Sequence, residues 1–145
     1  ITFSIGSFCF IKSSVLFDDV WVHNKSKKLH IVDYKATAKK TEVNIDATWQ
    51  QSYKRQLEVY QWLFRQNGFE VSDTGYFVYC NADTTQKVFN KNLGFKIKII
   101  PYEGKDNWVE ETLIQAHECL NSSKLPEPFH DCDYCNYRLE AKVAE

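Results

Sequence analysis

The stretch IVDYKAT, residues 31–37, has the alternating pattern of a β-strand and carries two charged side chains. Because strand side chains point alternately to opposite faces, Asp33 and Lys35 share one face, and Val32 and Tyr34 share the other. Burying a carboxylate or an ammonium group is costly unless the charge is paired or binds a metal ion. The pattern leaves three interpretations open: an internal salt bridge, a solvent-facing sheet edge, or a functional site.

Apolar segments on the N-terminal side predict further strands. Residues 2–11 and 15–22 are rich in Phe, Ile, Val and Trp and are separated by a short polar stretch, which favours an antiparallel hairpin. The polar turn HNKSKK, residues 23–28, leads into a strand over residues 29–35. We therefore expect these strands to form an antiparallel meander.

A long helix is predicted after the polar loop that ends at residue 47. Thr48 followed by Gln51 fits a capping box, and Gly68 suits the left-handed position that ends a helix. Steps of three and four residues indicate one helix face, formed by Trp49, Tyr53, Gln56, Tyr60 and Leu63. The amide of Gln56 interrupts this aromatic face, and a buried glutamine needs hydrogen-bond partners.

The C-terminal half alternates between strands and helices. Residues 74–80 form a nearly continuous apolar run, which favours a central strand. Further strands are predicted over KVFN, residues 87–90, and over residues 93–102, and Asp106 is expected to cap a helix over residues 108–120.

A loop with Pro126 and Pro128 then leads to HDCDYCNYR, residues 130–138, and a polar tail. The whole pattern predicts one α/β domain over residues 1–145, with a mixed β-sheet flanked by helices.

Composition narrows the function classes. The chain has 145 residues, 43% of them hydrophobic, and a formal net charge of −1, which does not favour a surface coated for nucleic-acid binding. A local basic rim around an acidic centre stays possible.

No apolar run approaches the ~18 residues of a membrane span, so no membrane partner is expected. The sequence contains no methionine, so we expect a further N-terminal segment before Ile1. Five cysteines at uneven spacing favour a reducing cytoplasm over a secreted disulfide framework.

Acidic residues in two neighbouring strands suggest a metal site. The segment LFDDVWV carries Asp18 and Asp19, and one of them must point to the same face as the core. That carboxylate can lie beside Asp33 on the adjacent strand. Like charges this close need a cation, and carboxylate oxygens suit Mg²⁺ or Mn²⁺. Lys35 is then placed to polarise a water or to hold a phosphate.

These motifs, in this order, resemble those of the PD-(D/E)XK nuclease superfamily. The segments FDDV, IVDYK and QLEVY stand where the family has an acidic strand residue, an hhDYK strand (h, hydrophobic) and a Q-x-x-x-Y helix. The sequence is most similar to the RecB-like branch, which includes recombination-repair exonucleases and the nucleases of CRISPR adaptation.

The resemblance implies a restriction-endonuclease-like α/β fold and hydrolysis of DNA phosphodiesters with Mg²⁺ or Mn²⁺. It assigns Asp18, rather than the residue after it, and Asp33 as metal ligands, with the backbone carbonyl of Tyr34 as a further ligand. Lys35 would position the attacking water and stabilise charge on the phosphate. A supporting or DNA-positioning role falls to Gln56 and Tyr60.

The C-terminal cysteines depart from the family pattern. Many RecB-like enzymes hold a [4Fe–4S] cluster with three C-terminal cysteines, whereas this sequence has only Cys132 and Cys135 there. A complete cluster within this chain is therefore not expected. The pair could hold zinc together with His130 and a fourth ligand such as Cys9, although free thiols are the more common state. A metal-binding histidine upstream of the first Asp is also common in the branch. The sequence starts at Ile1, so such a histidine would belong to the expected N-terminal segment.

Two rival functions stay open at this point. A catalytically inactive nuclease-fold module could bind nucleic acid or a partner subunit, and another metal-dependent hydrolase could use the same residue types. The expected partners are DNA and other subunits or domains of a larger nuclease, helicase or defence complex, in DNA repair, recombination or defence. Four basic residues could line a DNA path or simply be solvated, namely Lys39, Lys40, Lys54 and Arg55.

Overall fold

A computed structural model describes residues 2–5, 9–12, 16–85 and 93–144. The backbone forms two compact units, residues 1–110 and 111–145. The strands are β1 (Thr2–Ile5), β2 (Cys9–Lys12), β3 (Asp19–Val22), β4 (Leu29–Thr37), β5 (Thr74–Ala82) and β6 (Phe95–Glu103). The helices are the 3-10 turn η1 (Thr48–Gln50), α1 (Gln51–Gln66), α2 (Val109–Asn121) and α3 (Asp133–Ala144).

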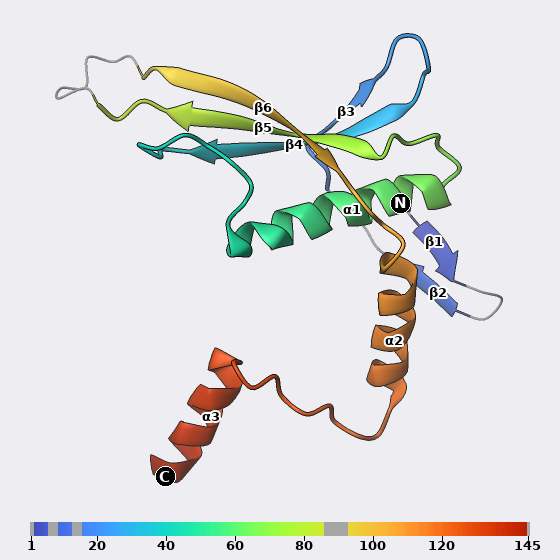
Figure 1. Ribbon diagram of the computed structural model, residues 1–145. Coiled ribbons are helices and arrows are strands. Elements are labelled where there is room, and N and C mark those ends of the chain that lie inside the picture. The colour runs from blue at the N-terminus through green and yellow to red at the C-terminus, as the bar shows by residue number, and fades with distance from the viewer. Residues whose placement is uncertain (1, 6–8, 13–15, 86–92, 145) are drawn as a thin grey trace. The chain divides into compact units, whose positions relative to one another are not determined.

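The main sheet is mixed and has the strand order β3-β4-β5-β6 (Figure 1). Strands β4 and β5 are parallel, and the other two neighbouring pairs are antiparallel. Parallel neighbours need a crossover connection, and α1 lies between these two strands in the sequence. The predicted α/β fold with a mixed sheet is confirmed, and β5 is a central strand as its apolar run indicated.

The predicted N-terminal meander is only partly correct. Residues 2–11 were expected to form one strand, but β1 and β2 pair with each other in a separate two-stranded sheet. The available signal was Gly6, because glycine weakens the interior of a strand. Strand β3 does pair antiparallel with β4 as expected, but it begins only at Asp19.

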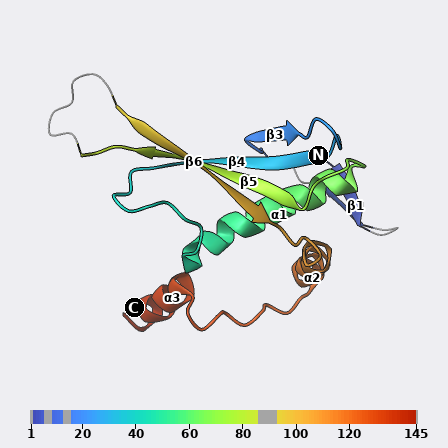
Figure 2. The same ribbon diagram turned by 45° about the horizontal axis from the view of Figure 1, so that its top comes forward.

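One face of the sheet packs on α1, as Figure 2 shows. Buried side chains from β4, β5 and α1 form this core, among them Ile31, Leu57 and Phe77, each fully inaccessible to solvent. Gly75 allows the close approach, because a Cβ there would lie 2.7 Å from a methyl carbon of Leu57. The same sheet face carries Asp33, so the core and the candidate site are neighbours.

The start of α1 differs from the predicted capping box of Thr48 and Gln51. The chain enters through η1, and the Gln50 side chain accepts a hydrogen bond from the backbone N–H of Ala47 at 3.0 Å. The predicted helix end is confirmed, because Gly68 has φ +82° directly after the C-cap residue.

The buried face of α1 is rotated from the predicted one. Tyr60 and Leu63 are buried as expected, but Trp49 is 56% exposed and Gln56 is exposed. The expectation of a buried Gln56 was therefore wrong. Leu57 lies at the centre of the core instead, because the three-and-four spacing also fits the residues next to the predicted stripe.

The C-terminal half contains one helix more than predicted. Strand β6 and helix α2 match their predicted positions within a few residues, whereas KVFN, residues 87–90, lies outside the described residues. Residues 133–144 were expected to form a loop and tail but form α3. Among the described helices, none combines the length and apolarity of a membrane span.

Candidate active site

Asp33 and Lys35 form an ion pair on the α1-facing side of β4. Nζ of Lys35 lies 2.7 Å from Oδ2 of Asp33 and 4.2 Å from the ring centre of Tyr53 on α1. Asp33 is only 4% exposed. The internal salt bridge that the sequence left open is present, and it lies at the position where a functional site was expected.

Asp18 reaches the same point from the segment just before β3. This residue is exposed, and its Oδ2 accepts a hydrogen bond of 2.7 Å from the backbone N–H of Tyr34. In a strand, the N–H and C=O of one residue point to the same side, so the Tyr34 carbonyl faces the side where Asp18 lies. The β3 pairing ends at Asp19–Val32 and does not reach Tyr34.

The Asp33 carboxyl is in an environment that opposes its ionisation. Burial raises its pKa above the ordinary value of 3.8, and Lys35 opposes this shift through its hydrogen bond and charge. Asp18 raises the pKa further through its like charge and a side-chain hydrogen bond. The two carboxylates are thus neighbours, and a proton or a cation between them relieves their repulsion.

Asp19 lies on the opposite face of the sheet. Its carboxylate accepts hydrogen bonds from the backbone N–H of Val20 (2.8 Å), the indole of Trp21 (3.2 Å) and the hydroxyl of Tyr34 (3.0 Å). These donors, the Val20 amide first, lower the pKa of Asp19. Asp18 and Asp19 therefore have distinct surroundings, and only Asp18 lies beside Asp33.

Gln56 and Tyr60 connect α1 to the segment that carries Asp18. The Gln56 side-chain amide donates to the Tyr60 hydroxyl at 2.8 Å, and this hydroxyl donates to the backbone carbonyl of Leu16 at 2.9 Å. Leu16 is two residues before Asp18. Gln56 and Tyr60 therefore contact the backbone segment that positions the Asp18 carboxylate, which fits a supporting role.

Two polar residues of this region were missed by the sequence reasoning. Tyr79 on β5 is aligned with Lys35 of β4, and its hydroxyl accepts a 3.2 Å hydrogen bond from the fully buried amide of Gln50. Burial raises the pKa of Tyr79. The available signal was the period-two alternation of β5, which places Tyr79 on the same face as Phe77.

The donor set fits a hard divalent cation. Two adjacent carboxylates and a backbone carbonyl are oxygen ligands, which Mg²⁺ and Mn²⁺ prefer, with water completing the shell. Burial is the main cause of the raised pKa of Asp33, and the like charge of Asp18 adds to it, so a cation bound between the two carboxylates would oppose this shift. Within the described part of the chain, no group of three or more His, Cys, Asp or Glu side chains could hold a metal, so the carbonyl of Tyr34 would be needed as a third protein ligand.

The cysteine motif lies in the second unit. Cys132 precedes α3 and Cys135 lies in its first turn. The side-chain hydrogen bond between the two residues lowers the pKa of the Cys132 thiol and raises the pKa of the Cys135 thiol. Nε2 of His130 lies 3.5 Å from Oδ2 of Asp131, and both side chains are mostly exposed. Across the residues described, these side chains do not gather into a metal-binding group.

Comparison with known proteins gave one match. The sequence model of the PD-(D/E)XK nuclease superfamily matches residues 18–139. Neither the curated proteins nor the solved structures gave a match. The matched range begins at Asp18 and contains every residue of the candidate active site.

Proposed function

Because the chain belongs to the PD-(D/E)XK nuclease superfamily, we propose that it is a Mg²⁺- or Mn²⁺-dependent nuclease that hydrolyses DNA phosphodiester bonds. The observation that carries the proposal is the pairing of the Asp18 and Asp33 carboxylates beside the Lys35 amine. Metal-assisted phosphodiester hydrolysis uses a divalent ion held by anionic ligands, and a neighbouring amine can stabilise the charge that develops on the phosphate.

Each residue has a role that follows from its surroundings. Asp18, Asp33 and the Tyr34 carbonyl would hold the divalent ion, which when bound supplies a water of lowered pKa and charge neutralisation at the phosphate. When the ion binds, Lys35 would give up its ion pair with Asp33. Its amine would then orient the attacking water or the scissile phosphate. Tyr60, supported by Gln56, fixes the backbone that presents Asp18.

We further propose the RecB-like exonuclease type and a cytoplasmic role in DNA repair, recombination or defence. The motif order supports the type: an acidic residue before β3, the DYK segment of β4 and the Gln56–Tyr60 pair of α1 follow one another along the chain. Cys80, Cys119, Cys132 and Cys135 are free thiols, which suits a reducing compartment.

A cleavage assay tests the nuclease proposal. Single- and double-stranded DNA, labelled at either end, would be incubated with the protein in Mg²⁺, Mn²⁺ or EDTA. We expect cleavage that needs the metal and is lost in Asp33→Ala, whereas Asp19→Ala on the opposite sheet face keeps it. Loss of the label as mononucleotides indicates exonuclease action, and internal fragments indicate endonuclease action.

Two outcomes would contradict the proposal. Cleavage that survives Asp33→Ala means that the site lies elsewhere. No cleavage by a folded full-length protein favours the inactive, nucleic-acid-binding or subunit-binding module.

A further inference from the structure

An exposed tryptophan lies next to the candidate active site. Trp49 is 56% exposed, although tryptophan is highly buried on average. Its ring packs edge-on against Tyr53, with the ring centres 5.4 Å apart. Tyr53 in turn lies under the amine of Lys35 at 4.2 Å. Contacts therefore run without a break from the Asp33–Lys35 pair to Trp49.

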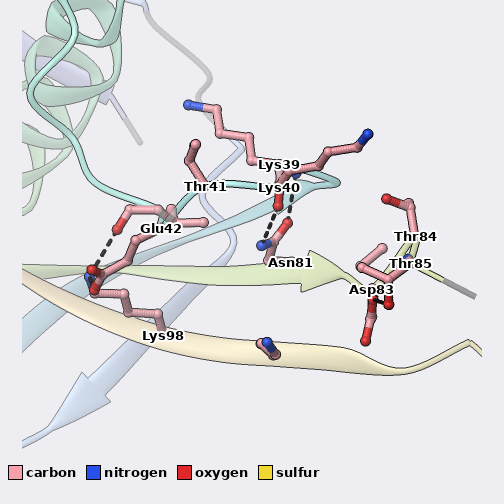
Figure 3. A pocket seen from close by; sticks show the side chains of 12 residues that line it. Lys39, Lys40, Thr41, Glu42, Asn81, Asp83, Thr84, Thr85 and Lys98 are labelled. Carbon is pink, nitrogen blue, oxygen red and sulfur yellow. Dashed lines mark hydrogen bonds and ion pairs between the residues drawn. The ribbon is translucent and has the colours of Figure 1, made fainter.

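A lysine lies over this tryptophan. Nζ of Lys39 is 5.3 Å from the ring centre of Trp49. The backbone of Lys39 is fixed to β5, because its N–H donates to Asn81 Oδ1 at 2.9 Å and its carbonyl accepts from Asn81 Nδ2 at 3.0 Å. Figure 3 shows this double hydrogen bond and the side chains of Lys39 and Lys40 extending in different directions from the loop. The backbone of Lys39 is thus anchored to β5, with its amine beside the Trp49 ring.

The loop also borders a cavity with an excess of positive charge. This cavity, of about 450 Å³, lies between residues 39–43, the end of β5 and the start of β6. Its lining contains four lysines and two carboxylates, which leaves a net charge of +2. Glu42 is paired with Lys98 at 2.5 Å. The excess charge therefore falls on the part of the lining that includes Lys39 and Lys40, in a chain whose overall charge is −1.

We propose that Trp49, Lys39 and Lys40 form a binding track for a single-stranded polynucleotide that leads to the candidate active site. A base would stack on the Trp49 ring, and the phosphates on either side of it would contact the two lysines. Alternating aromatic and basic side chains are the usual means of binding single strands, because only an unpaired base offers its face for stacking. That the track leads to an active site rests on the proposed nuclease function, whereas the binding of a single strand to these three residues does not.

Binding without cleavage tests the track separately from catalysis. Fluorescence anisotropy would be measured in EDTA with labelled single strands of about 20 nucleotides, as DNA and as RNA, and with the matching duplex. The variants are Trp49→Ala, Trp49→Phe, Lys39→Gln and Lys40→Gln. Matched controls are Phe69→Ala, another half-exposed aromatic residue, and Lys25→Gln in the exposed turn before β4.

We expect Trp49→Ala to weaken single-strand binding by about 5- to 150-fold, and Trp49→Phe to restore most of it, because stacking on one base is lost and regained. Each lysine variant should reduce the slope of log K against log salt by about 0.7. The control variants should bind like the unmodified protein. Loss with DNA only, RNA only or both identifies the polynucleotide.

Binding that Trp49→Ala leaves unchanged, or a duplex that binds as tightly as the single strand, would overturn the track. A protein that binds through Trp49 but never cleaves in Mn²⁺ would retain the track and reject the nuclease function. The two proposals can therefore fail independently.

Discussion

The carboxylate of Asp18 lies beside that of Asp33, and through its charge and a hydrogen bond it raises the pKa of Asp33. The larger cause of that shift is burial, and Lys35 counteracts it. A site arranged in this way retains a proton above the ordinary pKa of an aspartate. A divalent cation in place of that proton would relieve the repulsion between the two carboxylates.

Metal affinity should therefore depend on pH. Below the raised pKa of Asp33 a cation must displace the proton, so the apparent affinity for Mn²⁺ should rise as the pH rises from the ordinary value of 3.8 through the raised pKa. Above that pKa it should level off. Calorimetric titrations with Mn²⁺ over a pH series would measure this, and proton release on binding should decline over the same range. An affinity that stays constant across the range would show that Asp33 is not a ligand.

The metal-free protein should become more stable when Asp33 is replaced by asparagine. An acid with a raised folded pKa lowers stability as the pH rises from 3.8 through that pKa, since the folded state then binds more protons than the unfolded state. Asp33→Asn removes this loss, so its thermal midpoint in EDTA at pH 7 should lie above that of the unmodified protein. Added Mn²⁺ should stabilise only the unmodified protein.

Glu58 provides the contrasting substitution. This carboxylate is also buried, but it accepts hydrogen bonds from Tyr102 (2.7 Å), the Lys105 amide (3.1 Å) and the Trp108 indole (2.7 Å). Glu58→Gln should lower the free energy of unfolding by about 2 kcal/mol, because these bonds to a charged group are lost or weakened. Cleavage per folded molecule should be unchanged. Urea unfolding of both variants would check the opposite signs, and equal signs would contradict this account.

Tyr60→Phe should loosen the segment that presents Asp18. The substitution removes the hydrogen bonds to Leu16 and Gln56 and should lower the free energy of unfolding by about 1 kcal/mol. Metal affinity should fall while kcat at saturating metal changes less, because Asp18 is mispositioned rather than lost. Tyr102→Phe, which removes a hydroxyl bonded to Glu58, is the matched control for stability alone. Identical metal affinity in both variants would remove Tyr60 from the supporting role.

Lys35→Gln should separate catalysis from metal binding. The substitution removes a cation 2.7 Å from Asp33, so the carboxylates should bind Mn²⁺ at least as tightly as before. Cleavage should nevertheless fall by about 10²- to 10³-fold, because charge on the phosphate loses a fixed partner. Lys25→Gln in the exposed turn is the control. Weakened Mn²⁺ binding in Lys35→Gln would indicate that the lysine only holds the site together.

The sequence predicted the part of the fold that local periodicity determines. The strand alternation of IVDYKAT placed Asp33 and Lys35 on one face, and their contacts with each other and with Tyr53 confirm that placement. The parallel pairing of β4 with β5 could not be derived in this way, because it depends on how α1 crosses the sheet. The separate β1–β2 pair was missed for a related reason, since an apolar run does not identify its partner strand.

The face of α1 that is buried differs from the predicted face, so the exposure of its polar residues was not predicted correctly. Side chains on both edges of a helix face satisfy the same spacing, so Gln56 was predicted as buried when it is exposed. Which aspartate lies beside Asp33 was also beyond period-two reasoning, because Asp18 precedes β3 rather than belonging to it. The superfamily resemblance, and not the alternation, selected Asp18. The catalytic and metal-binding roles of these residues stay predictions, as does a single domain over residues 1–145.

Mn²⁺ binding by isothermal titration calorimetry is the most direct test of the central claim, that two carboxylates converge on one divalent ion. The unmodified protein would be compared with Asp18→Asn, Asp33→Asn and Asp19→Asn at pH 7. We predict one site that is lost in the first two variants and retained in Asp19→Asn, whose carboxylate bonds to Trp21 and Tyr34 on the other sheet face. Binding that survives in both Asp18→Asn and Asp33→Asn, or that depends on Asp19, would contradict the account.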